Sequence, residues 1–318
     1  MAENGPDKPI HVGVMGTWNW LEVAAELLRL AGMTCEVFDM RSRRQLMRWV
    51  MQGHWRRFDV IHHLWGGRRA QGVLFAALRK PVVWHWIGSD VLAFKAICRG
   101  GGGWRGGVTR TMIYRWSAMH LVDSPQLAEE LASCGIPAEV VRLLPKTIEA
   151  QVYPLPDKPA VLSYWNPGSR DFYHAPLVLK LAESFPDVKF LIVGDDGAGL
   201  PAPGNVKFLG RLADLDDVYR QVSIYLRLVR HDSLSVMVLE AFARGRHVIY
   251  NMPCPFSVAA GTFEEVKGAM QRLVTVREPN QAGAEYVRRN YSVSREAENL
   301  KSAYARGLRG IVGHGSLR

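Results

Sequence analysis

The chain has 318 residues, of which 48% are hydrophobic and 22% charged, a balance that describes a folded globular protein, favours two domains and excludes a disordered chain. Its four cysteines are scattered without a CxxC pair, which argues against a disulfide framework or a zinc site and favours reduced thiols in a cytosol. The net charge of +10 indicates an anionic partner, whether a nucleotide, a nucleic acid or an anionic lipid.

The start of the chain and its apolar runs both favour a cytoplasmic protein. The first residues, MAENGPDKP, are polar and lack an apolar core, so the sequence predicts no signal peptide. No apolar run approaches 18 residues, so we expect no helix that spans a membrane.

Residues 1–150 alternate short apolar runs with helical patterns, which predicts a parallel sheet with crossover helices. The expected strands are residues 10–15, 34–38, 58–63, 81–85 and 138–142, with a further strand at 121–122 that runs into a Ser-Pro helix start. Gly16 follows the first strand, where a residue without a Cβ lets the backbone approach a ligand closely. The same glycine also fits a plain turn, and the lack of a GxGxxG pattern gives a dinucleotide site little support.

Two segments of this first domain mix basic with aromatic and Met side chains. Residues 41–57, RSRRQLMRWVMQGHWRR, predict either a basic helix that lies on an anionic membrane surface or a crossover helix whose Arg face is solvated. Residues 94–116 contain a glycine-rich stretch at 100–107 without the order of a P-loop, and a mobile acceptor loop fits it better.

Four prolines within residues 145–159 mark an interdomain linker, and a second α/β domain follows. The expected strands there are residues 161–164, 188–193 and 206–209, with a helix over 177–185. Residues 291–307 predict a C-terminal helix.

Residues 222–251 predict a complete βαβ unit. An apolar strand at 224–229 leads through His231-Asp232-Ser233, which offers helix N-cap candidates, into a helix that starts near Val236 and stops at Gly245. Ligands of such units lie at the carboxyl end of the strand, where the helix N-terminus favours an anion. Glu240 lies one to two turns into this helix. Its two carboxylate oxygens match a pair of ribose hydroxyls, although an ordinary unit with a solvated Glu is the simpler alternative.

The stretch from Asp232 to Gly245, DSLSVMVLEAFARG, resembles the donor-site signature of family 4 glycosyltransferases, which have the GT-B fold. The family's signature is Glu-x7-Glu; Glu240 matches its second Glu, Asp232 replaces the first, and Ser235 replaces a glycine. The resemblance implies an α/β chain with two Rossmann-like domains that face a central cleft. We place an acceptor domain at 1–150, a nucleotide-sugar donor domain at 151–290, and a helix at 291–318 that returns to the first domain.

The resemblance also implies roles for other residues. Gly194 and Arg211 end strand patterns that look like those of the family, the second of which lines the base pocket. Arg170 matches an Arg that faces the donor diphosphate, while the family's Lys has no counterpart unless His174 replaces it. His85 and Asp90 belong to a His-x-x-Gly-Ser-Asp pattern that looks like an acceptor-side loop, where a buried structural His is the alternative.

The implied function is transfer of a sugar from a nucleotide-diphosphate sugar to an acceptor hydroxyl with retention, without a metal ion or other cofactor. Gly16, Ser233 and Ser235 would face the nucleotide, and Arg170 with the amides near Ser235 would stabilise the leaving diphosphate. Glu240 would hold the ribose, Asp232 the donor sugar, and His85 and Asp90 would position sugar and acceptor.

The acceptor and two other functions stay open at this point. A lipid-linked acceptor or a cell-surface glycan precursor would suit a protein that attaches through residues 41–57 to the inner face of the cell membrane. Asp232 and the missing Lys motivate a nucleotide-sugar-binding protein without transferase activity, and a GT-B nucleotide-sugar epimerase is a further alternative. Nucleic acid is an unfavoured partner, because only the charge and the scattered Trp residues support it.

Overall fold

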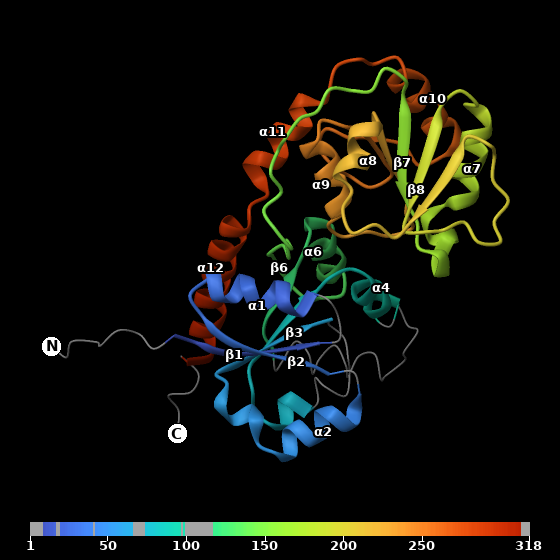
Figure 1. Ribbon diagram of the computed structural model, residues 1–318. Helices are drawn as coiled ribbons and strands as arrows, with labels where there is room; N and C mark the ends of the chain where they lie inside the picture. Colours follow the sequence, from blue (N-terminus) through green and yellow to red (C-terminus); the bar gives the residue numbers. More distant parts are fainter. Residues whose placement is uncertain are drawn as a thin grey trace. The chain divides into compact units, whose positions relative to one another are not determined.

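The computed structural model describes residues 9–16, 20–40, 42–65, 74–96, 98 and 117–312. The chain divides into two compact units, Met1–Thr147 with Ser292–Arg318 (unit 1) and Ile148–Tyr291 (unit 2). Within the described residues each unit contains one six-stranded parallel sheet with helices, the α/β class that the sequence predicts (Figure 1). In the structure the boundary between the units lies between residues 147 and 148, whereas the sequence predicts it between residues 150 and 151.

The sheet of unit 1 has the strand order β2-β1-β3-β4-β5-β6. Its strands are β1 (His11–Gly16), β2 (Thr34–Asp39), β3 (Val60–Leu64), β4 (Val82–Trp86), β5 (Ser117–Val122) and β6 (Glu139–Val140). Its helices are α1 (Trp20–Leu30), α2 (Arg43–Met51), the 3-10 turn η1 (His54–Arg57), α4 (Ser89–Ala96), α6 (Pro125–Ala132) and α12 (Val293–Val312).

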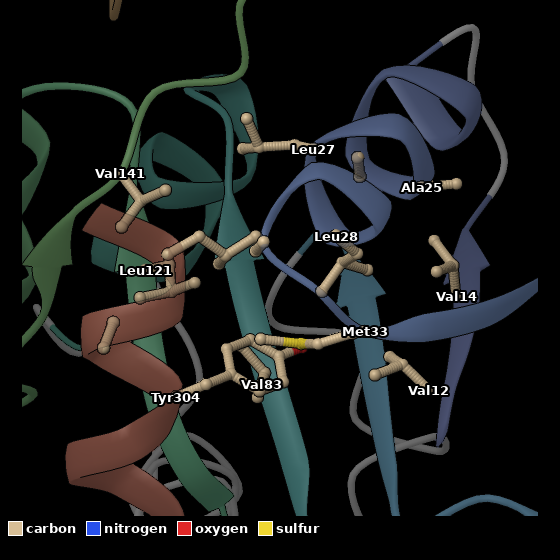
Figure 2. Packing of buried hydrophobic residues seen from close by; sticks show 14 of the residues in the cluster. Val12, Val14, Ala25, Leu27, Leu28, Met33, Val83, Leu121, Val141 and Tyr304 are labelled. Atoms are coloured by element: carbon tan, nitrogen blue, oxygen red, sulfur yellow. The ribbon is translucent and has the colours of Figure 1, made fainter. Parts of the chain in front are cut away.

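The C-terminal helix α12 completes the core of unit 1. Its buried residues Leu300 and Tyr304 belong to the same apolar cluster as Leu28 of α1 and Leu121 of β5. Figure 2 shows Leu28, Leu121 and Tyr304 directed into this common space from three elements. Burial of such side chains contributes roughly 1.5–3 kcal/mol each. The last helix of the chain therefore stabilises the unit that contains the first strand.

A buried chain of hydrogen bonds fastens α12 to the sheet. The Tyr304 hydroxyl lies 2.8 Å from Nδ1 of His62, Nε2 of His62 lies 3.2 Å from Nδ1 of His85, and Nε2 of His85 lies 2.9 Å from the carbonyl oxygen of Val141. A carbonyl only accepts, so Nε2 of His85 carries a proton, and in neutral rings the direction then runs from Tyr304 through His62 to His85. The chain needs neutral imidazole at His62.

The predicted basic helix divides in two. The capping box of Ser42 and Gln45 starts α2, and Gly53, at φ 72°, separates it from η1. Leu46 and Trp49 are buried in the core, so Trp49 is not available to a membrane surface in this arrangement of α2. Arg41, the side chain of Arg43 and most of the predicted loop at 94–116 lie outside the described residues.

The sheet of unit 2 has the strand order β12-β11-β10-β7-β8-β9. Its strands are β7 (Ala160–Tyr164), β8 (Lys189–Val193), β9 (Val206–Gly210), β10 (Ile224–Arg227), β11 (His247–Tyr250) and β12 (Val258–Ala259). Its helices are η3 (Pro167–Tyr173), α7 (Ala175–Ser184), α8 (Asp216–Gln221), α9 (Val236–Ala243), α10 (Phe263–Leu273) and α11 (Gln281–Asn290).

The linker into unit 2 is held by a fully buried cation, Arg246. Its guanidinium donates to the carbonyl oxygens of Tyr153 and Pro154 in the linker, and to that of Val222 (2.8 Å) just before β10. Burial lowers the pKa of Arg246 to about 10.

Among the described helices, none is long and apolar enough to cross a bilayer.

We predict that acid weakens this fold through His62 and His120. Burial, with His85 and His63 nearby, lowers the pKa of His62, and burial lowers that of His120 to about 3. An unfolded imidazole titrates near 6.5, so below that pH the unfolded state binds protons that the native state does not. The free energy of unfolding should therefore decrease as the pH falls below 6.5, by about 1.4 kcal/mol per pH unit for each of the two residues. Above pH 6.5 their contribution should not depend on pH.

Urea unfolding between pH 7.5 and 5 checks this expectation. His120→Gln keeps an acceptor for the Trp86 indole N–H, which lies 3.2 Å from Nδ1 of His120. In this variant the free energy of unfolding should depend less steeply on pH, because one of the two histidines no longer contributes. His54→Gln, in the half-exposed η1, is the matched control for removal of an imidazole outside the core. Equal slopes in His120→Gln and the wild type would contradict the assignment of His120.

Candidate functional site

The carboxyl ends of β7, β10 and β11 meet at one edge of the sheet of unit 2. The three strands are parallel, with Ile224 of β10 opposite both Val161 of β7 and His247 of β11. The loops that follow them, at 165–174, 228–235 and 251–257, therefore leave the same edge. This is the edge at which open α/β sheets bind ligands.

Helix α9 points its N-terminus to this edge from the end of loop 228–235. Ser235 is the N-cap residue, and its carbonyl accepts the amides of Val238 (3.0 Å) and Leu239 (3.3 Å). Its side chain makes no capping hydrogen bond within the described chain. The amides of Val236 and Met237 have no acceptor inside the helix, so they and the helix dipole suit an anion.

Glu240 is half-buried in a helix whose other residues from Val238 to Ala243 are buried and apolar. The hydroxyl of Tyr219, from α8, lies 3.3 Å from Oε2 of Glu240 and 3.2 Å from the carbonyl oxygen of Met237. Burial and then the charge of Glu240 raise the pKa of Tyr219 well above its usual value, so the hydroxyl stays protonated and donates. Glu240 is thus an ordered carboxylate in the helix whose N-terminus suits an anion, and its role at a ribose stays a prediction.

Asp232 has protein partners where a donor-sugar ligand was expected. Its Oδ2 accepts from Nε (3.0 Å) and Nη2 (2.9 Å) of Arg227 and from the hydroxyl of Tyr250 (2.8 Å), and its Oδ1 accepts the amide of Ser233 (3.1 Å). Both carboxylate oxygens are engaged, and the Arg227–Asp232 pair is nearly buried, with side chains 11% and 12% exposed. We therefore correct the interpretation: Asp232 holds loop 228–235 to β10 and β11.

Arg170 is likewise paired. Its Nε and Nη2 donate to the two oxygens of the buried Asp195 (2.7 and 2.8 Å), and Nη2 also reaches the carbonyl of Ala198 (3.1 Å). Hydrogen bonding to Arg170 lowers the pKa of Asp195 despite its burial. Among the described residues this leaves Nη1 of Arg170 as the donor edge for a ligand, so its role at the diphosphate stays a prediction.

His85 and Asp90 do not face open space. His85 is 0% exposed and belongs to the chain of hydrogen bonds behind α12. Asp90 is 1% exposed, and its Oδ1 accepts the amides of Ile87, Gly88 and Val91 at the start of α4. The prediction that they position sugar and acceptor is wrong for this arrangement, because burial and local hydrogen bonds use both side chains.

The remaining predicted residues have mixed surroundings. Gly194 is required by packing, since a Cβ there would lie 2.3 Å from the carbonyl oxygen of Trp165 at φ 88°. Gly16 is buried against Leu64, and the residues after it lie outside the described chain. Arg211 is exposed directly after β9.

Sequence reasoning missed Tyr219, Arg227 and Tyr250. The sequence does contain a signal for Arg227, because it is a charged residue within the otherwise apolar run Ile224–Val229. Its guanidinium lies over the rings of Tyr173 (5.3 Å) and Tyr164 (5.9 Å), a favourable contact for a cation.

Comparison with known proteins shows which family this part of the chain resembles. Residues 166–288 match the family model described as glycosyl transferases group 1. This segment is therefore similar to group 1 glycosyltransferases. It lies within unit 2 and includes η3, loop 228–235 and α9. A search of curated protein sequences gives no match.

Solved structures similar to this chain extend the comparison to both units. Sucrose-phosphate synthase from Thermosynechococcus elongatus has 14% identity, covers 95% of this chain and 100% of its own, and has a TM-score of 0.70. Anabaena Alr3699/HepE in complex with UDP-glucose has 13% identity, with 93% and 100% covered and a TM-score of 0.67. The lipopolysaccharide outer core galactosyltransferase WaaB has 12% identity, with 93% and 99% covered and a TM-score of 0.68. The fold is GT-B.

We predict that Asp232→Ala destabilises unit 2 by about 3–5 kcal/mol, because it leaves the buried charge of Arg227 without its partner. Urea unfolding measures this. The double variant Arg227→Leu with Asp232→Leu removes both charges and should lose clearly less than the sum of the two single variants. Glu26→Ala breaks an exposed pair with Arg29 and serves as the control, with little effect. A mild loss in Asp232→Ala would refute the clamp.

Proposed function

We propose that this protein transfers a sugar from a nucleoside-diphosphate sugar to an acceptor hydroxyl. The observation that carries the proposal is the N-terminus of α9 with Glu240 behind it, inside the segment that is similar to group 1 glycosyltransferases. The similar Anabaena protein is described in complex with UDP-glucose, which supports a nucleotide sugar as the donor. The amides of Val236 and Met237 would bind the diphosphate, and Glu240 would accept the two ribose hydroxyls.

The site suits a departing diphosphate. Breaking the bond between sugar and phosphate increases negative charge on the leaving group, and amides fixed at a helix N-terminus stabilise that charge without reorganising. Nη1 of Arg170, held in place by Asp195, would add a positive charge to the same group. We propose retention of configuration, with the leaving phosphate as the base, so that no separate basic side chain is needed.

We also propose that transfer needs no metal ion. The neighbouring carboxylates have partners in the protein: Asp195 pairs with Arg170 and the amide of Gly197 (2.8 Å), and Asp196 accepts the amide of Ala198 (3.0 Å). Turnover should then persist in EDTA, and a strict Mn²⁺ or Mg²⁺ requirement would refute this part.

For the acceptor we propose a lipid-linked molecule that enters beside α2. A cavity of about 360 Å³ lies between α2 and the carboxyl end of β2. Its lining includes Asp39, Gln45, Arg48, Gln52 and Phe38, so it offers hydrogen-bond donors and acceptors around an apolar wall. The end of a strand and an adjacent helix are where such folds place ligands.

The exposed face of α2 supports attachment to an anionic membrane. Arg44, Met47, Arg48 and Met51 follow helical spacing and are exposed, with Met51 76% and Met47 49% accessible. Met side chains can enter the headgroup boundary while Arg side chains bind anionic lipid. The proposed location is therefore cytoplasmic, with peripheral and reversible attachment.

A second candidate function is a nucleotide-sugar-binding protein without transferase activity. The specific observation in its favour is that Asp232 and Arg170 are both engaged by partners inside the protein. Product analysis with nucleotide sugars separates the cases: binding without turnover supports the second function, and an altered free nucleotide sugar would instead identify an epimerase.

We predict that Glu240→Ala weakens nucleoside diphosphate binding while the fold remains intact. A lost charge-assisted hydrogen bond costs about 1.5–3 kcal/mol, so affinity should fall at least tenfold. Calorimetry with the diphosphates of adenosine, guanosine, uridine and thymidine measures this. Glu264→Ala, on the exposed start of α10, is the control. Unchanged affinity in a folded Glu240→Ala variant would remove the ribose role.

We predict that the protein co-sediments with vesicles that contain phosphatidylglycerol and little with pure phosphatidylcholine. Each Arg near an anionic surface contributes about 1 kcal/mol, so Arg44→Glu with Arg48→Glu should lower binding at least tenfold, and salt should weaken it by screening. Arg272→Glu with Arg277→Glu in and after α10 changes the net charge equally and should keep binding. Equal binding to both vesicle types, or none at low salt, would reject the membrane surface.

A further inference from the structure

A second cavity lies at the opposite edge of the sheet of unit 1, at the amino ends of β5 and β6. It has a volume of about 500 Å³, within the range of small-molecule sites. Its lining includes Ser117, Met119, His120, Pro137, Glu139 and Arg306. These residues come from β5, from the entry to β6 and from α12, all within unit 1.

The short edge strand β6 explains why the cavity exists. β5 has six residues, but β6 pairs only with its last two, Leu121 opposite Glu139 and Val122 opposite Val140. The first part of β5, which includes Met119 and His120, therefore has no β6 residue beside it. The cavity occupies the place that a longer edge strand would fill.

His120 brings a buried donor to this cavity. The residue is 5% exposed, and the indole N–H of Trp86 lies 3.2 Å from its Nδ1. Because an indole only donates, Nδ1 accepts and the proton of the neutral ring is on Nε2. Nε2 of His120 has no hydrogen-bond partner among the described residues. Burial holds the pKa of His120 at about 3, so the ring stays neutral at physiological pH. An unsatisfied buried N–H costs about 1–3 kcal/mol unless a ligand or water accepts from it.

The charged groups of the lining balance one another. Arg306 of α12 and Glu139 of β6 form an ion pair, both partly exposed. Among the described lining residues, this pair and the neutral His120 provide donors and an acceptor but no net charge. A free anion would meet the carboxylate of Glu139, and a purely apolar ligand would leave Nε2 of His120 unsatisfied and strip water from the ion pair.

We propose that this cavity binds a neutral polyhydroxylated molecule of saccharide size. One hydroxyl would accept from Nε2 of His120, and others would donate to Glu139 and accept from Arg306. The apolar surfaces of Met119 and Pro137 would contact the C–H face of the sugar. The site lies at the amino ends of the strands in unit 1, so it is separate from the donor site of unit 2, and it does not depend on transferase activity.

Calorimetry and saturation-transfer NMR on the full chain test the site, with glucose, galactose, N-acetylglucosamine and maltose as probes and inorganic phosphate and octanoate as comparisons. We expect at least one sugar to bind and both comparisons to fail. His120→Phe and Arg306→Met should each weaken sugar binding at least tenfold. Lys301→Met, an exposed change on the same helix, and Glu240→Ala, in the donor site, should leave it unchanged.

Opposite results would overturn the inference. Absence of sugar binding would mean that water alone serves His120. Binding of phosphate or octanoate in place of sugar would assign another ligand chemistry. Sugar binding that is lost in Glu240→Ala but kept in His120→Phe would belong to the donor site. If His120→Phe does not fold by circular dichroism, Arg306→Met and Glu139→Gln at the partly exposed ion pair decide the question.

Discussion

The guanidinium of Arg246 is the interaction on which unit 2 depends. A cation without a carboxylate partner inside a protein costs several kcal/mol unless polar atoms surround it. Here carbonyl oxygens of Tyr153, Pro154, Val222 and Arg244 accept from it. These carbonyls belong to the linker, to the entry of β10 and to the end of α9, so one side chain fixes both ends of the strand–loop–helix segment that carries the candidate site. Burial lowers the pKa of Arg246 because it disfavours the charged guanidinium.

At the carboxyl ends of the strands in unit 2, two ion pairs occupy charged side chains that could otherwise bind a ligand. Asp232 is neutralised by Arg227, and Asp195 by Arg170, in pairs that are mostly removed from water. Among the described residues, the proposed donor site would use the N-terminus of α9, Nη1 of Arg170 and the carboxylate of Glu240, which also accepts from Tyr219. Fixed amides favour the phosphates, and a single carboxylate favours the ribose, so the remaining groups separate the two parts of a nucleotide in space. The proposed donor site thus differs from the one that the signature implies, because Asp232 is engaged inside the protein.

The sequence predicts the βαβ unit because its signals are local. The apolar run at 224–229, the polar turn and Gly245 appear in chain order and need no knowledge of distant contacts. The same reasoning covers β1 to β5 and α12 within a few residues. The sequence predicts no helix or strand between residues 251 and 290, because α10 and α11 contain few runs of strongly apolar residues.

Side-chain roles were less accessible, because they depend on partners that are distant in sequence. In the sequence His85 and Asp232 look alike, because each is a polar residue close to the end of an expected strand. Burial by α12, more than 200 residues later, makes His85 a structural residue, through the hydrogen bond between His62 and Tyr304. Tyr250, eighteen residues after Asp232, completes the clamp on that carboxylate. Neither relation leaves a trace in local spacing.

Helix α2 shows a conflict between local stability and surface charge. It has no acidic residue in its first turn and begins with Arg43-Arg44, although the positive end of the helix dipole disfavours cations there. The capping box of Ser42 and Gln45 and the burial of Leu46 and Trp49 offset this cost. Natural sequences break such local rules mainly where a function requires it. An anionic surface would neutralise the Arg residues and cover Met47 and Met51, so contact with it removes the conflict that the free helix carries.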